Sequence, residues 1–322
     1  MKRKLIVSAS LFALVFLTEL LFRKYSLIWA ENLSYFAFTP DYFRSIFAAP
    51  FPIYNLAKNF LLQFFGFHPL GPALIAALAV LGFLLIQAVL KVKREHIVAA
   101  VVAVPLLVQA LLPESIRHER MSRVLVSAKN HNWTEVLATA TPMRCRQNKD
   151  MLPFALLALQ NKGELKEKLN MYPVAQMYDL DYQGDDLTTG EFFEAMLAES
   201  LSLPNEAIHH VFQMNCGRPY CSCFLSLQLL VRNTLAKGDY TLARKYLRIL
   251  EKSPRFALEA RRIGKRLDAG KTDDCTGRNT SGHAQVVAKN PIVTLARIIE
   301  CGLGTRSCQD RFVAYQILSG EQ

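Results

Sequence analysis

Three long apolar segments, all within the first 112 residues, constrain the fold of this chain more than any other feature. Leu5–Phe22, Leu70–Leu90 and Ile97–Leu112 each approach or reach the roughly 20 apolar residues that cross a bilayer as a helix. They account for the high share of hydrophobic residues, 51% of the chain. We therefore predict an all-α protein with a membrane domain over residues 1–112, with spans at about 5–22, 70–90 and 97–112, and a soluble helical domain over residues 113–322.

The first apolar segment follows Lys2, Arg3 and Lys4, a basic start that secretory signal peptides share. Its apolar core of 18 residues is long for a signal peptide, and no small-x-small cleavage motif follows it. We interpret it as an uncleaved membrane anchor.

Basic residues in short loops mark the cytoplasmic side of a membrane protein. Lys2–Lys4 precede the first apolar segment, and Lys91–Arg94 fill the turn between the second and the third. Both clusters are therefore placed in the cytoplasm, and three crossings put the soluble domain on the other side. This pattern predicts a multi-pass protein of a bacterial inner membrane with a periplasmic C-terminal domain.

Residues 35–67, between the first two spans, are rich in aromatic residues, whose rings partition favourably into the headgroup region of a bilayer. We predict an amphipathic extramembrane segment there. Glu19 is the only acid inside a predicted span, and Arg23, four residues later on the same helix, is its expected ion-pair partner.

All seven cysteines follow the apolar segments. Disulfides persist in oxidising compartments, so this distribution fits an exported domain with up to three bridges, whose connectivity the sequence leaves open. Cys301 and Cys308 could close a small loop. The candidate disulfide residues are Cys216, Cys221, Cys223, Cys301 and Cys308.

The soluble domain repeats one pattern, in which a helix ends at a small or polar turn and an aromatic or leucine residue opens the next helix. The clearest copy is 239–250, where Ala243, Leu247 and Leu250 fall on one face of a helix that Asp239 can cap and that pairs with 225–236.

The turn residues His131, Gly163, Ser202 and Gly238 are 32, 39 and 36 residues apart, close to the 34-residue period of tetratricopeptide repeats. We predict an α-solenoid of degenerate tetratricopeptide-like helix pairs, with an irregular helical bundle as the alternative. The residues expected to pack these repeats are Trp133, Gly163, Ala207, Gly238, Tyr240, Ala243 and Leu247.

Three stretches resemble a family of uncharacterised membrane proteins from Bacteroides-like bacteria, known as a domain of unknown function. The resemblance implies a membrane protein with helical repeats and no known activity. Members of that family carry more spans than the three counted here, so this chain would be a shortened form. The stretches are 156–165 running on to Tyr182-Gln183-Gly184, the turn Leu203-Pro204-Asn205-Glu206-Ala207, and the repeat motif 238–250.

Two clusters could suggest a metal. His209, His210, Cys216, Cys221 and Cys223 lie within 15 residues, but no Cys-x2-Cys pair is present, and disulfides are the favoured interpretation.

Residues 179–190 begin like a calcium loop but end in Gly190 where the loop needs Glu, so we interpret them as an acidic loop that caps a helix.

No phosphate-binding glycine loop, His-Glu-x-x-His, Gly-x-Ser-x-Gly or Cys-x-x-Cys motif is present. We therefore expect no enzyme activity, metal or cofactor. The soluble domain carries a charge of only about +5 over some 210 residues, which is too dilute to indicate nucleic acid.

The predicted function is a membrane-anchored helical-repeat protein that binds a protein or peptide partner on the extracytoplasmic side. The alternative is a shortened subunit or fragment of a larger multi-span membrane enzyme or transporter. The identity of the partner and the oligomeric state stay open.

Overall fold

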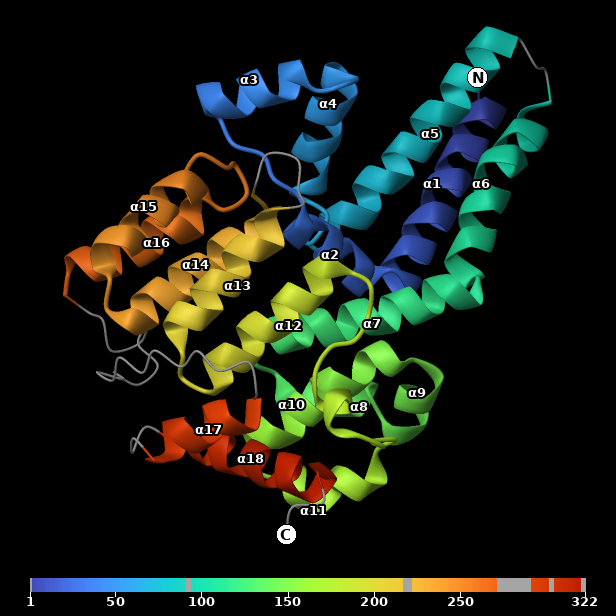
Figure 1. The fold of residues 1–322 in the computed structure, drawn as a ribbon. Coiled ribbons are helices and arrows are strands. Elements are labelled where there is room, and N and C mark those ends of the chain that lie inside the picture. Colours follow the sequence, from blue (N-terminus) through green and yellow to red (C-terminus); the bar gives the residue numbers. More distant parts are fainter. Residues whose placement is uncertain (1, 91–93, 217–221, 271–290, 301–303, 320–322) are drawn as a thin grey trace. The chain divides into compact units, whose positions relative to one another are not determined.

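The computed structural model describes residues 2–90, 94–216, 222–270, 291–300 and 304–319, and within these ranges every regular element is a helix (Figure 1). The all-α prediction is therefore confirmed. Two units divide the chain, one made of Met1–Phe36 and Phe43–Val126, the other of Ala37–Tyr42 and Ser127–Gln322. Residue 112, the predicted domain boundary, lies at the 60° bend between Glu95–Leu111 and Pro113–Lys129.

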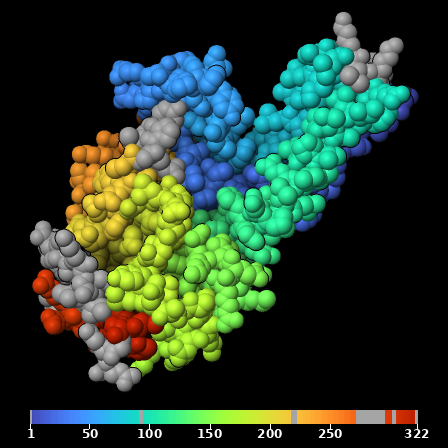
Figure 2. All heavy atoms as spheres, turned by 45° about the vertical axis from the view of Figure 1, so that its right-hand side comes forward, coloured from blue at the N-terminus to red at the C-terminus, as the bar shows by residue number. Residues whose placement is uncertain are grey.

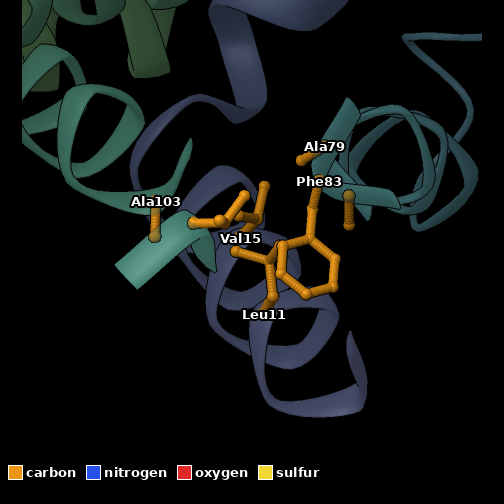
Figure 3. Packing of buried hydrophobic residues seen from close by; sticks show 7 residues of the cluster. Leu11, Val15, Ala79, Phe83 and Ala103 are labelled. Carbon is orange, nitrogen blue, oxygen red and sulfur yellow. The ribbon is translucent and has the colours of Figure 1, made fainter. Parts of the chain in front are cut away.

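The first unit is built on three long helices that pack against one another. Helix α1 contacts both α5 and α6, and α5 also contacts α6. Figure 1 shows α1 between the other two helices, and Figure 2 shows the atoms of this group from another side. Phe83 of α5 points toward Leu11 and Val15 of α1, with the small residues Ala79 and Ala103 nearby (Figure 3). The helices of this unit are α1 (Lys2–Phe22), α2 (Lys24–Leu33), α3 (Pro40–Ala48), α4 (Pro52–Leu62), α5 (Leu70–Leu90), α6 (Glu95–Leu111) and α7 (Pro113–Lys129).

Two of these helices, α1 and α5, are long and apolar enough to cross a membrane. Helix α6 meets the same test only together with α7, from which it is bent by 60°. Its own 17 residues extend about 26 Å, slightly less than the roughly 30 Å of a bilayer core. The described residues thus contain two or three candidate spans, and the third predicted span depends on α6.

Two further predictions for the first unit can be compared with the structure. Arg23 Nη1 lies 3.3 Å from Glu19 Oε1, which confirms the predicted ion pair at the end of α1. The segment 35–67 is more regular than its sequence suggests, because it contains the helices α3 and α4. Its aromatic residues Phe47, Phe51 and Tyr54 are exposed, as an interfacial segment requires.

The second unit surrounds one helix that is apolar on every side. Residues Leu152–Gln160 of α10 are all buried, because other helices cover each of its faces. Phe154 stacks on Phe192 and meets Phe193 edge to face. The α-helices of this unit are α8 (Trp133–Thr139), α9 (Pro142–Gln147), α10 (Leu152–Lys162), α11 (Leu165–Lys168), α12 (Leu187–Ser200), α13 (Pro204–Cys216), α14 (Phe224–Lys237), α15 (Tyr240–Leu250), α16 (Ala257–Asp268), α17 (Pro291–Glu300) and α18 (Arg306–Ser319).

The four predicted turn residues share one backbone geometry. His131, Gly163, Ser202 and Gly238 all have positive φ, at 54°, 70°, 61° and 84°. Each donates its N–H to the carbonyl three residues back, and the next residue donates to the carbonyl five residues back. This is the Schellman end of a helix, in which the left-handed residue satisfies carbonyls that the helix leaves open.

Consecutive helices pack on one another from α12 to α16, each against the next in the chain. The predicted pair is confirmed: α14 lies against α15, and Asp239 Oδ1 accepts the N–H of Leu242 at 3.0 Å as the cap of α15. Ala243 and Leu247 are buried in that contact.

Candidate functional site

A cavity of about 290 Å³ opens in the second unit between α14 and α16. We call it the α14–α16 groove. Its apolar wall is formed by Leu229, Val231, Leu235, Leu250, Phe256, Ala260 and Ile263, and its polar residues are Lys129, Asn130, Gln228, Arg232 and Glu259.

Local sequence signals explain why the groove exists. Gly238 ends α14 in a left-handed turn, so the chain returns along α14 as α15. After α15 a turn leads to Phe256, whose ring packs on Phe224 at the start of α14, with ring centroids 4.5 Å apart. Helix α16 is therefore fixed at its N-terminal end by Phe256 and along its length by α15. The groove is the space that remains between α16 and α14.

The polar end of the groove contains a buried donor without an acceptor. Lys129 Nζ donates to Gln228 Oε1 at 2.8 Å. The other half of that amide, Nε2, is shielded from solvent and has no hydrogen-bond partner among the described residues. A buried unsatisfied donor costs about 1–3 kcal/mol, and a ligand oxygen would recover that energy once the Gln228 side chain turns to present this N–H to the groove.

Behind the groove a second polar cluster connects α12 to α14. Arg232 donates to Glu199 Oε1 at 3.0 Å and to Oε2 at 2.5 Å, and also to the Lys129 carbonyl at 2.7 Å. Asn233 and His131 complete the shell of the carboxylate, at 2.5 and 3.4 Å. This shell holds Arg232 in place at the wall of the groove.

The charge of Glu199 is maintained by these partners. Burial alone would raise the pKa of this carboxyl, but the Arg232 guanidinium, followed by His131 and Asn233, holds the pKa below its usual range. Glu199 is therefore ionised at neutral pH and neutralises Arg232.

Another buried cluster fastens α18 to the unit. The guanidinium of Arg311, fully enclosed, donates to Asp181 at 2.6 Å, to Gln160 at 3.0 Å and to the Leu180 carbonyl at 3.0 Å. Burial raises the pKa of Tyr315, which also donates to Asp181, to about 12. Every polar atom named here has a protein partner, so we interpret this cluster as structural.

A smaller cavity of about 260 Å³ lies beside the acidic loop, lined by Asp150, Asp179 and Asp181 among others. Asp179 accepts the N–H groups of Ala175 and Gln176, and Asp181 accepts from Arg311 and Tyr315. Asp186, in the same loop, caps α12. The described residues contain no group of three or more acidic, histidine or cysteine side chains able to hold a metal ion. The predicted cap is confirmed, because Asp186 accepts the N–H groups of Thr188 and Thr189 at the start of α12.

One constellation in the first unit resembles a hydrolytic triad in composition. Ser26 Oγ lies 3.1 Å from His118 Nδ1 and donates to Glu119 Oε2 at 2.6 Å. In a triad the carboxylate orients the ring, and the ring takes the hydroxyl proton. Here Glu119 instead accepts the hydroxyl and the N–H groups of Tyr25 and Ser26, which makes it the cap of α2.

The predicted disulfides are not found among the described residues. Cys145, Cys216, Cys223 and Cys308 carry free thiols, so the pair Cys301–Cys308 is not formed, and Cys221 and Cys301 lie outside the described residues. The thiol of Cys223 has another role, because it accepts the Ser226 N–H at 3.4 Å as part of the cap of α14. The cysteine argument for an oxidising compartment therefore loses its structural support.

The residues predicted to pack the repeats do not line the groove. Ala207, Ala243 and Leu247 are buried between helices, Gly163 and Gly238 end helices, and Trp133 and Tyr240 are half-buried at helix starts. The residues that sequence reasoning missed are Lys129, Gln228 and Arg232. The available signal was the pair Arg232-Asn233 among the buried apolar residues of helix α14.

The model of one family, a family of unknown function (DUF6057), matches residues 1–118 and 109–291. The two matches meet where α6 passes into α7. No curated protein and no solved structure matches the chain. The resemblance to an uncharacterised family is confirmed to that extent, and the bacterial source and tetratricopeptide-like repeats stay predictions.

Proposed function

We propose that this chain, which belongs to the family of unknown function DUF6057, is a membrane-anchored helical protein that binds a segment of a partner protein in the α14–α16 groove. The observation that carries the proposal is the buried, unpartnered Nε2 of Gln228 beside an apolar wall. A peptide supplies both matching groups, because its carbonyl or terminal carboxylate can accept this N–H while an apolar side chain covers the wall.

The α-solenoid remains part of this proposal. The shared helix ends at His131, Gly163, Ser202 and Gly238 and the sequential packing from α12 to α16 support it. Stacked helix pairs expose a long concave surface, which is where such proteins bind extended segments.

The extracytoplasmic placement of the second unit is proposed from the basic residues alone. Lys2–Lys4 and Lys91–Arg94 favour a cytoplasmic N-terminus and a cytoplasmic turn after α5. If α6 crosses the membrane as a third span, the second unit then lies outside the cytoplasm of a bacterial cell.

Photo-crosslinking in native membranes tests the groove. A photoreactive residue at Ile263, on the groove wall, should capture one discrete partner, whereas the same residue at Ile317, which is exposed on α18 and away from the groove, should not. The same adduct from both positions, or none from Ile263, would contradict the proposal.

A matched pair of glutamine variants tests the amide. Gln228→Met keeps a similar volume and removes the donor, so we expect the Ile263 adduct to decrease at least severalfold. Gln213→Met, at an exposed glutamine whose amide contacts His209, should leave the adduct unchanged. An equal effect of both variants would show that the donor is not used.

A further inference from the structure

The positive charge of the second unit is concentrated in two helices. Residues 237–268 contain ten Lys and Arg against four Asp and Glu, a net charge of +6, whereas all of 127–322 carries 25 against 21, a net charge of +4. In contrast, residues 169–217 contain eight acids and no Lys or Arg. The average charge of the soluble part is dilute, but the charge of the α15–α16 pair is not.

The cations of this pair are exposed and form stripes along the helices. We call α15, α16 and the turn between them the basic hairpin. Residues four apart lie on one face of a helix, which aligns Arg244, Arg248 and Lys252 along α15 and its end. Antiparallel packing brings the start of α15 to the end of α16, where Arg244 pairs with Asp268 at 2.8 Å. The exposed cations are Arg244, Lys245, Arg248, Lys252, Arg261, Arg262, Lys265 and Arg266.

An exposed leucine belongs to the same surface. Leu258 is 79% exposed and lies three, four and seven residues before Arg261, Arg262 and Lys265, hence on their face of α16. A leucine among cations, on a helix whose opposite side is buried through Ala260 and Leu267, is the composition of helices that lie in a membrane interface.

The basic hairpin is also hydrogen-bonded to Ala37–Tyr42, a short segment of the same unit that interrupts the first unit in the sequence. The N–H of Phe38 donates to the carbonyl of Lys252, in the turn of the hairpin, at 2.9 Å. Phe38 belongs to Ala37–Tyr42, which follows Phe36 and precedes Phe43 of the first unit in the sequence.

We propose that the basic hairpin is a docking surface for anionic lipid headgroups, with the α16 stripe at the phosphates and Leu258 inserted between headgroups. Anchoring by α1 and α5 would keep the hairpin at a high effective concentration of lipid headgroups, so that individually weak contacts suffice for binding. An acidic protein or a nucleic acid fits the charge but leaves Leu258 unexplained. The inference rests on the proposed membrane anchoring and not on the groove.

Hydrogen exchange of the full chain in lipid nanodiscs tests whether the basic hairpin binds anionic lipid. Amides of 257–268 should exchange severalfold more slowly in discs of phosphatidylcholine and phosphatidylglycerol than in pure phosphatidylcholine, and high salt should remove the difference, because ions screen exposed charges. Equal exchange in both lipids would overturn the inference. Failure of the chain to insert into either disc would instead reject the anchoring itself.

Charge-reversal and leucine variants of α16 test which residues contact the lipid. Arg261→Glu with Arg262→Glu should abolish the lipid difference, and Leu258→Gln should reduce it. Lys162→Glu with Lys166→Glu, an equal charge change at exposed lysines of another part of the unit, should retain it. Unchanged exchange of α14 in each variant verifies folding. If polyglutamate or single-stranded DNA added to neutral discs slows 257–268 as much as the anionic lipid does, the surface is a general polyanion site and the assignment to lipid is wrong.

Discussion

At the scale of single residues, the ion pair between Glu199 and Arg232 makes the stability of the second unit depend on pH. The pKa of Glu199 is held below its ordinary value of 4.5, so the folded state favours the carboxylate. Its stabilising effect is fully present above that ordinary value and is lost as the pH falls through the lower, folded-state pKa. We expect the melting temperature of the wild type to fall on acidification below about pH 4.5 more steeply than that of Glu199→Gln.

At neutral pH, Glu199→Gln itself should cost about 2–3 kcal/mol. That is less than a fully buried pair, because Arg232 is one-third exposed and water takes up part of its charge. Glu167→Gln, at an exposed acid of α11, is the control and should be nearly silent. Parallel pH profiles for Glu199→Gln and wild type would contradict the assigned charge.

The cysteines give a second prediction at this scale. Cys216 is exposed and should react with a maleimide in the native protein, whereas Cys145, Cys223 and Cys308 are buried and should react only after unfolding. For Cys145, burial also raises the pKa of the thiol to about 12, so almost no reactive thiolate is present. Mass spectrometry of the labelled peptides, without reductant, decides between free thiols and bridges, and Cys216→Ser should remove the fast label.

At the scale of elements, the shared helix ends predict opposite effects for two substitutions. Ser202 has φ 61°, a conformation that costs a residue with a Cβ about 1 kcal/mol, so Ser202→Gly should stabilise the protein by about 0.5–1 kcal/mol. Gly238 has φ 84° and open space around it, so Gly238→Ala should destabilise by about 1 kcal/mol through the backbone alone. Melting temperatures that shift in the same direction would disprove the common geometry.

The packing of α15 on α14 gives the other prediction at this scale. Ala243 is fully buried in the contact between the helices, and an Arg there must push the helices apart or bury its charge. Ala243→Arg should therefore cost several kcal/mol, roughly 3 or more, whereas Arg248→Ala on the exposed face should change stability by under about 0.5 kcal/mol. Thermal melts of the full chain in detergent measure both, and equal melting points would refute the orientation of α15.

At the scale of the whole molecule, the number of spans decides on which side of the membrane the second unit lies. With α1 and α5 alone, the C-terminus returns to the side of the N-terminus, and with α6 as a third span it lies opposite. We expect alkaline phosphatase fused after Gln322 to be active and green fluorescent protein fused there to be dark, because both basic clusters favour a cytoplasmic N-terminus. The reverse pattern would contradict this placement, because either α6 does not cross or the N-terminus lies outside the cytoplasm.

Features within a few residues of one another could be predicted from the sequence alone. The pair Glu19–Arg23, the cap at Asp239, the buried face of α15 and the positions of the four turns follow from short-range hydrogen bonds and helical periodicity. These interactions are set by φ, ψ and a spacing of three or four residues, so the local sequence contains all the information they need.

The groove and its charges were decided only by the tertiary structure. Arg232 meets Glu199 across 33 residues, and Arg311 meets Asp181 across 130. The sequence could show that a charge interrupts an apolar helix, but not which distant group neutralises it, because helix packing determines that pairing. The positive charge of residues 237–268 can be counted in the sequence, but the packing of α15 on α16 and the buried Nε2 of Gln228 without a hydrogen-bond partner are seen only in the structure.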